Sequence, residues 1–92
     1  MSSEDLNATI LSDMHETYVA KNSDYGDSFN KTTDEFGLVA PVIRMNDKLN
    51  RFKQLALEDS KQQVTDESQY DTLIDLANYA VLTAMYIKEH NK

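Results

Sequence analysis

The chain contains no cysteine, only one proline and only two glycines. Without cysteine, it can form neither a disulfide nor a thiolate metal site, so neither can reinforce the core. A chain of 92 residues buries only about 60–65% of the surface that its unfolded form exposes. We therefore expect a single domain over residues 1–92 that gains further burial by associating with copies of itself.

Positive charge is also scarce, because Lys and Arg total 9 against 16 Asp and Glu, a formal net charge of −7. An acidic chain repels the phosphate backbone, so we expect no nucleic-acid polymer as a partner. The longest uncharged stretch, residues 76–87, is shorter than the about 20 residues that span a bilayer. The first residues are acidic and polar, where a signal peptide needs basic and then apolar residues. These features predict a cytoplasmic protein without a membrane partner.

The rarity of helix breakers, together with apolar residues recurring every three or four positions, predicts an all-α fold. A first helix is expected over about residues 3–21, followed by turn formers at 22–27. A short second helix is expected from near Thr32, because Thr32 and Glu35 have the spacing of a capping box. The apolar stripe of the first helix comprises Leu6, Ile10, Met14 and Tyr18.

Two longer helices complete the predicted fold. Pro41 suits a first helical turn, so the third helix is expected over about residues 41–57. The fourth helix is expected from Thr65 or Asp66 to about His90, with acids at the positive end of its dipole. Its later part is apolar nearly all round, which predicts burial on more than one side, against another subunit. The expected buried face of the third helix comprises Val42, Met45, Leu49, Phe52 and Ala56.

The start of the fourth helix carries three acids on one face, because Glu67, Asp71 and Asp75 are each four residues apart. No Lys or Arg lies between Lys61 and Lys88, so no cation on this helix neutralises them. Converging carboxylates without counterions suit Mg²⁺, which prefers hard oxygen ligands. The alternative is a solvated or salt-bridged face, since acids in a first helical turn also gain from the helix dipole.

Cations gather on one face of the third helix, where Arg44, Lys48 and Arg51 surround Asp47. This face could hold a polyphosphate, with Asp47 as a metal ligand from a second helix. Alternatively, Asp47 and Arg51 form an ordinary ion pair at i,i+4. Because the acidic and cationic faces are complementary, we expect them to meet, as a salt-bridge network or as a substrate cleft.

The segment after the first helix combines a cation, an amide and an aromatic ring beside a glycine turn, at Lys21, Asn22 and Tyr25. Such a set can stack on a nucleobase and hydrogen-bond to its edge. It is equally consistent with a helix C-cap and a loop.

Three sequence blocks together resemble a nucleotide-modification-associated domain family that is common in bacteriophages and similar to the MazG-like, all-alpha nucleoside triphosphate pyrophosphohydrolases. The blocks are residues 21–29 (KNSDYGDSF), 44–51 (RMNDKLNR) and 66–79, which includes DTLIDLANY. The resemblance implies a four-helix MazG-like bundle completed by oligomerisation, as a dimer or tetramer. It also implies Mg²⁺-dependent cleavage between the α and β phosphates, in a host-cell cytoplasm if a phage encodes the chain.

The resemblance assigns roles to individual residues. It makes Asp47, Glu67, Asp71 and Asp75 candidate metal ligands, with Asp47, Asp71 and Asp75 as the catalytic acids. Phosphate contacts would come from Lys21, Lys48 and Arg51. Asn22, Tyr25, Arg44 and Asn78 complete the predicted ligand-binding set, with Tyr25 against the base and Asn78 either contacting the sugar or supporting a residue that binds the ligand.

The sequence leaves three functions open. The first is a Mg²⁺-dependent pyrophosphohydrolase that converts a nucleoside triphosphate to the monophosphate and pyrophosphate. The second is an oligomeric protein that sequesters a nucleotide without cleaving it, such as a signalling nucleotide of host defence. It arises because Thr72 stands three residues before Asp75, where the pyrophosphohydrolases carry an acid. The third is an interaction protein whose acids and cations form ion pairs only.

Overall fold

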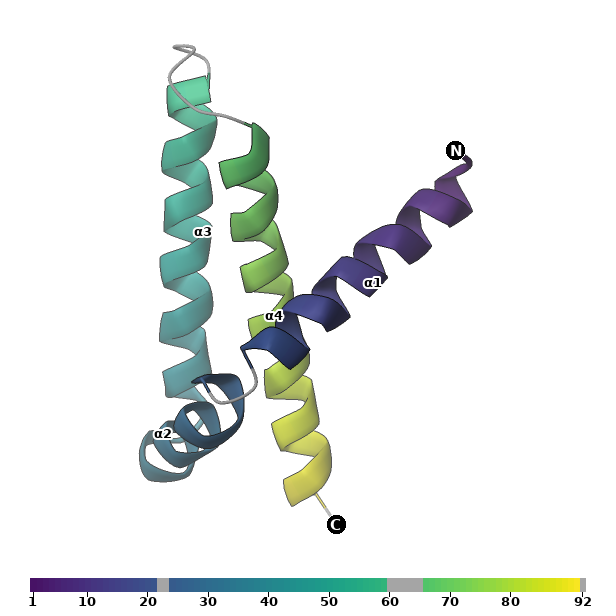
Figure 1. Ribbon diagram of the computed structural model, residues 1–92. Coiled ribbons are helices and arrows are strands. Elements are labelled where there is room, and N and C mark those ends of the chain that lie inside the picture. The colour runs from purple at the N-terminus through teal and green to yellow at the C-terminus, as the bar shows by residue number, and fades with distance from the viewer. Residues whose placement is uncertain (22–23, 60–65, 92) are drawn as a thin grey trace.

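A computed structural model describes residues 1–21, 24–59 and 66–91 of the chain (Figure 1). All regular structure in these residues is helical, which confirms the predicted all-α class. A five-residue π-helical turn, η1, precedes the second of the α-helices. The elements are α1 (Ser3–Ala20), η1 (Asp24–Ser28), α2 (Phe29–Phe36), α3 (Val39–Asp59) and α4 (Asp66–His90).

Helix α1 begins at the expected residue and ends within one residue of the expected end. The Ser2 hydroxyl accepts a hydrogen bond from the Asp5 amide at 3.1 Å, and Glu4 and Asp5 place acids in the first turn. The last turn closes with a bond from the Lys21 amide to the Thr17 carbonyl at 3.0 Å. No residue of α1 is buried, and its N-terminal half extends away from the other helices (Figure 1).

The predicted start of the second helix is wrong, because α2 begins at Phe29 and Thr32 lies inside it. The helical conformation starts earlier than the capping signal suggests, since η1 passes directly into α2. Within the helix, the Thr33 hydroxyl donates to the Phe29 carbonyl at 2.8 Å. Gly37 ends α2 with a φ of 78°, a left-handed conformation that favours glycine.

Helices α3 and α4 pack antiparallel along their length, as the two upright helices of Figure 1 show. Pro41 lies in the first turn of α3, as expected. The predicted buried face of α3 is wrong in part, because Val42 is 56% exposed, Leu49 is 41% exposed and Ala56 is exposed as well. Helix α3 carries two adjacent apolar rows and only one of them can face α4. The buried and half-buried row comprises Pro41, Met45, Lys48, Phe52 and Leu55.

The main core lies where η1 and α2 meet the C-terminal half of α4. Tyr25, Phe29 and Leu82 are its buried members. The rings of Tyr25 and Tyr79 meet edge to face, with centroids 5.6 Å apart, a favourable geometry for aromatic pairs. This core fixes the chain that follows α1 against α4. No helix in the part of the chain that the structure describes is long and apolar enough to cross a membrane.

Candidate functional site

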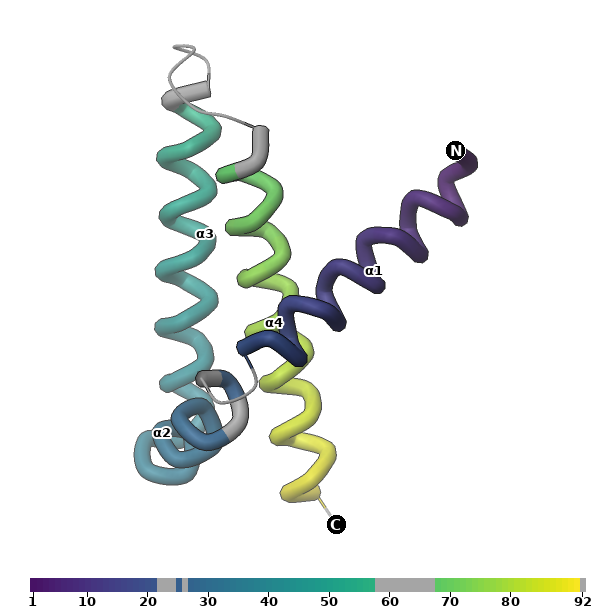
Figure 2. Tube along the Cα trace, in the orientation of Figure 1, coloured from purple at the N-terminus to yellow at the C-terminus, as the bar shows by residue number. Residues whose placement is uncertain are grey.

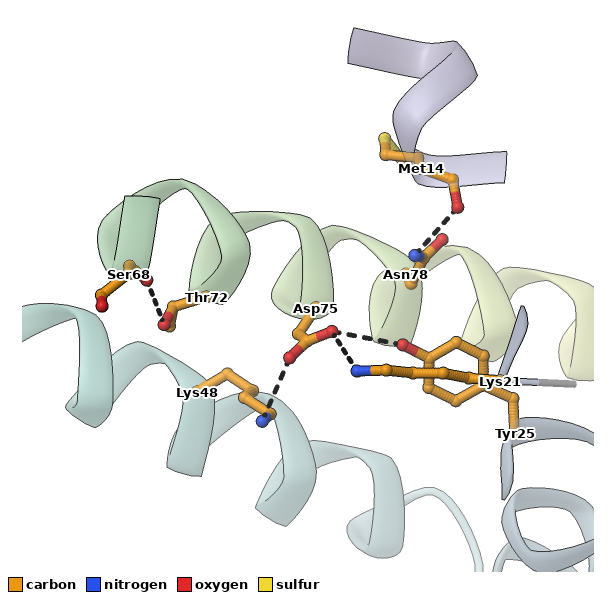
Figure 3. Close-up of polar contacts among 8 residues, drawn as sticks. All are labelled: Met14, Lys21, Tyr25, Lys48, Ser68, Thr72, Asp75 and Asn78. Atoms are coloured by element: carbon orange, nitrogen blue, oxygen red, sulfur yellow. Dashed lines mark hydrogen bonds and ion pairs between the residues drawn. The ribbon is translucent and has the colours of Figure 1, made fainter. Parts of the chain in front are cut away.

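Asp75 is the point where three parts of the chain meet (Figure 3). Lys21, just after α1, donates to Asp75 Oδ1 at 3.2 Å. Lys48 of α3 lies 3.4 Å from Oδ2, and the Tyr25 hydroxyl donates to Oδ1 at 3.4 Å. The Asp75 side chain is only 18% exposed, so these contacts replace hydrogen bonds that the carboxylate would make with water.

The prediction that the acidic and cationic faces meet is therefore supported at Asp75. No cation on α4 itself neutralises this acid, but Lys21 and Lys48 do so from outside the helix. Lys48 reaches it from the row of α3 that packs on α4.

Tyr25 supports this arrangement from within the core. It is 3% exposed, and the pKa of its hydroxyl is raised to about 12, chiefly by burial. The negative charge of Asp75 contributes to this rise, while a hydrogen bond with Asn78 opposes it. The hydroxyl thus remains protonated and donates to Asp75. The ring is covered by core neighbours, so stacking against a nucleobase would require Tyr25 to leave its place in the core.

A hollow of about 390 Å³ opens beside this point between α3 and α4. We call it the cation pocket. Neither Arg44 nor Arg51 has an ion-pair partner among the residues that the structure describes. With Lys48 and Asp47, they give the pocket three positive charges and one negative charge. Its lining comprises Arg44, Asp47, Lys48, Arg51, Thr72 and Tyr79.

A second hollow of about 440 Å³ lies between α1 and α4, and we call it the acid pocket. Helix α4 contributes Asp71 and Asp75 to it, and α1 contributes Asp13 and Glu16. The Tyr70 hydroxyl, also in the lining, donates to Asp13 Oδ2. The two pockets adjoin at Asp75, which lines the acid pocket and pairs with Lys48 of the cation pocket.

Sequence reasoning missed Asp13 and Glu16. Their i,i+3 spacing was the available signal, since it puts two carboxylates on one face of α1. What sequence could not show is that this face of α1 lies opposite the acids of α4.

The predicted metal ligands do not share one place in the structure. Asp71 and Asp75 line the acid pocket, whereas Asp47 lines the cation pocket. The side chain of Glu67 lies outside the described residues, as does Asn22. Among the side chains that the structure describes, no three His, Asp or Glu groups converge as a ready metal site.

Asn78 ties α1 to α4. It is 3% exposed, and its Nδ2 donates to the Met14 carbonyl at 3.1 Å (Figure 3). In this position Asn78 supports the helix that carries half of the acid pocket. Its predicted role near a sugar stays a prediction.

Comparison with known families gives one match. Residues 21–87 match the family described as Nucleotide modification associated domain 1. This range includes both lysines that bind Asp75, the whole cation pocket and all of η1, α2 and α3. Comparison with curated proteins and with solved structures yields no significant match.

Proposed function

This chain belongs to the Nucleotide modification associated domain 1 family, and from that membership and the geometry around Asp75 we propose that it binds a nucleoside triphosphate and hydrolyses it to the monophosphate and pyrophosphate. This is the reaction of the MazG-like, all-alpha pyrophosphohydrolases. The observation that carries the proposal is that a cationic hollow and an acidic hollow adjoin at one carboxylate.

The cation pocket is suited to the phosphates. Arg44 and Arg51 have no ion-pair partner in the described chain, so a ligand would not have to displace an internal carboxylate from them. A guanidinium group can bind two phosphate oxygens at once, which gives direction as well as charge. Lys48 adds a third cation at the edge nearest Asp75. Asp47 leaves the pocket with a net charge of +2.

The acid pocket has the donor chemistry for Mg²⁺. This ion is usually held by one or two carboxylates, with waters and substrate phosphates completing its coordination. No three of the described acids lie close enough together to hold a metal ion, and one or two carboxylates are enough for Mg²⁺ when substrate phosphates supply other ligands. We propose Asp71 and Asp75 as its holders on α4, with Asp47 and Glu67 as further candidates. When bound, Mg²⁺ would polarise the phosphoryl group and lower the pKa of water.

The chain's own residues would perform three tasks in this reaction. The cation pocket would hold the polyphosphate and neutralise the charge that develops on pyrophosphate as it leaves. Asp71 would orient the attacking water and accept its proton. Lys21 and Lys48 would hold the Asp75 carboxylate in place between the two pockets. Water adds to the α phosphorus as the bond to the bridging oxygen breaks.

A second candidate function is sequestration of a nucleotide without cleavage, as in a phage protein that removes a signalling nucleotide of host defence. Both oxygens of Asp75 already pair with lysines, and Asp13 accepts a bond from Tyr70. Fewer acids are therefore free to hold a metal than an efficient hydrolase carries. The cation pocket is unaffected by this shortage, so binding would persist where hydrolysis does not.

One set of measurements separates these functions. The protein is incubated with a panel of ribo- and deoxyribonucleoside triphosphates, with Mg²⁺ or with a chelator, and pyrophosphate release and product mass are followed. The same nucleotides are titrated calorimetrically. We expect Mg²⁺-dependent release of pyrophosphate with at least one of them. Binding without turnover, with the nucleotide recovered intact, would replace hydrolysis with sequestration.

Variants assign the two tasks to the two pockets. Asp71→Asn should abolish turnover and retain binding. Arg51→Ala should weaken binding about tenfold or more, because a charge-assisted hydrogen bond contributes about 1.5–3 kcal/mol. Lys53→Ala, an equal loss of charge on α3 outside the cation pocket, is the matched control. If no nucleotide binds with or without metal, both functions fail.

A further inference from the structure

Lys48 belongs to two charged groups at once. Its ammonium group lies 3.4 Å from Asp75 Oδ2, and its side chain also lines the cation pocket with Arg44 and Arg51. The side chain is 35% exposed, so a ligand can reach it. Among the cations that the structure describes, no other both pairs with an acid and lines this pocket. A phosphate in the cation pocket would therefore compete with Asp75 for one ammonium group.

Asp75 has separate support at its other oxygen. Oδ1 accepts hydrogen bonds from the Lys21 ammonium group at 3.2 Å and from the Tyr25 hydroxyl at 3.4 Å. In Figure 2, α1 crosses α4 near its middle whereas α3 runs alongside α4, so Lys21 and Lys48 reach Asp75 from different parts of the chain. Tyr25 is fixed in the core. If Lys48 moved away, Oδ2 would lose its cation while Oδ1 kept both donors.

We propose that Lys48 exchanges between two anions: it pairs with Asp75 in the free protein and with a phosphate oxygen when a nucleotide is bound. The inference rests on the proposed function, because it takes a nucleoside triphosphate as the ligand. The exchange leaves Asp75 Oδ2 open to Mg²⁺, which prefers hard oxygen ligands. Lys48 thus holds Asp75 until the phosphates arrive, and Lys21 and Tyr25 hold it afterwards.

The charges favour this exchange. Lys48 and Asp75 form a partly exposed pair, and such pairs are weak. A triphosphate carries more negative charge than one carboxylate, and Arg44 and Arg51 would hold it beside Lys48. Without phosphate, each oxygen of Asp75 faces a lysine, so the free protein should bind Mg²⁺ weakly. Phosphate and metal should each strengthen binding of the other, because coupling between two sites is reciprocal.

Inorganic pyrophosphate, titrated calorimetrically in the presence of a chelator, tests the competition for Lys48 without metal. Asp75→Asn removes the competitor, so pyrophosphate should bind about two- to fivefold more tightly than it binds the wild type. Most of this gain should disappear when Asp75→Asn is made in a Lys48→Met background, because the shared lysine is absent. Simple repulsion between Asp75 and pyrophosphate would give the same gain in both backgrounds. That result overturns the exchange, as does the absence of a gain in the single variant.

Mn²⁺, titrated into the phosphate-free protein and followed by electron paramagnetic resonance of the free ion, tests the effect on Asp75. Mn²⁺ takes the same oxygen ligands as Mg²⁺. Lys48→Met should bind Mn²⁺ about tenfold more tightly than the wild type, because it opens Oδ2 and removes a repelling charge. Arg51→Met is the matched control, since it removes an equal charge from the same pocket but no ion pair within the described chain. Equal affinities of the wild type and Lys48→Met, or an equal gain in Arg51→Met, overturn the exchange.

Neither titration follows turnover, so the exchange and the proposed hydrolysis can fail separately. A protein that releases pyrophosphate from a nucleotide but shows none of these shifts keeps its proposed function and lacks the exchange. A protein that shows the shifts without turnover keeps the exchange and sequesters its ligand. Circular dichroism reports whether each variant folds. If Asp75→Asn does not fold, the Mn²⁺ titration of Lys48→Met decides the question.

Discussion

Asp75→Asn gives the sharpest test of the charge arrangement around α4. Asparagine keeps the shape of the side chain and an oxygen that accepts from Tyr25, but it removes the charge that binds Lys21 and Lys48. The two lysine side chains are 46% and 35% exposed, so water can solvate them once they are released. Each pair therefore contributes close to the value of an exposed pair, about 0.2–1 kcal/mol.

Because the carboxylate itself is only 18% exposed, we expect each of the two losses to lie in the upper part of that range. The free energy of unfolding should fall by about 1–2 kcal/mol. For a domain of this size, each kcal/mol corresponds to about 4–8 °C in Tm. The variant should thus unfold about 5–15 °C below the wild type.

Urea unfolding followed by circular dichroism measures this change, at one fixed protein concentration because self-association alters apparent stability. Asp71→Asn is the matched control: Asp71 is exposed and has no ion pair within the described residues. We expect it to stay within about 0.5 kcal/mol of the wild type. High salt should reduce the difference in unfolding free energy between Asp75→Asn and the wild type, because it screens the ion pairs. Equal stability of the wild type and Asp75→Asn, or an equal loss in Asp71→Asn, would refute the reasoning.

Three further predictions concern the supports of the site. The pKa of Tyr25 is about 12 in the folded chain, against an ordinary value of 10.0. The protonated hydroxyl therefore contributes fully to the free energy of unfolding below about pH 10, and this contribution is lost as the pH rises through 12. Tyr25→Phe should reduce the loss of stability at alkaline pH, measured by unfolding at a series of pH values. Asn78→Ala should lower the unfolding free energy by about 1–3 kcal/mol, since it leaves the Met14 carbonyl without its donor, whereas Asn46→Ala on the exposed side of α3 should have little effect. Leu55→Ala should cost about 2–5 kcal/mol because Leu55 is 2% exposed, and Leu57→Ala, at 66% exposed, should change the denaturation midpoint little.

The sequence alone was enough to identify most of the helices. The acids at the start of α4 and the proline in the first turn of α3 are local signals, because a helix end depends on the few residues that cap it. The same holds for the end of α1 at Ala20, because turn formers follow it in the sequence. The start of α2 could not be found this way, since η1 carries the chain into α2 without a capping residue. The three blocks that resemble a nucleotide-modification-associated family lie within residues 21–87, the range that matches it.

The candidate site depended on tertiary structure. Periodicity shows that α3 has an apolar side, but only packing against α4 selects the row that contains Lys48 and brings its ammonium group to Asp75. Lys21 and Asp75 are 54 positions apart, and nothing local to either predicts their contact. The crossing of α1 over α4 is also what places Asp13 and Glu16 opposite the acids of α4. A helix carries its own pattern in its sequence, whereas the surface it meets is decided by how all the helices share one small core.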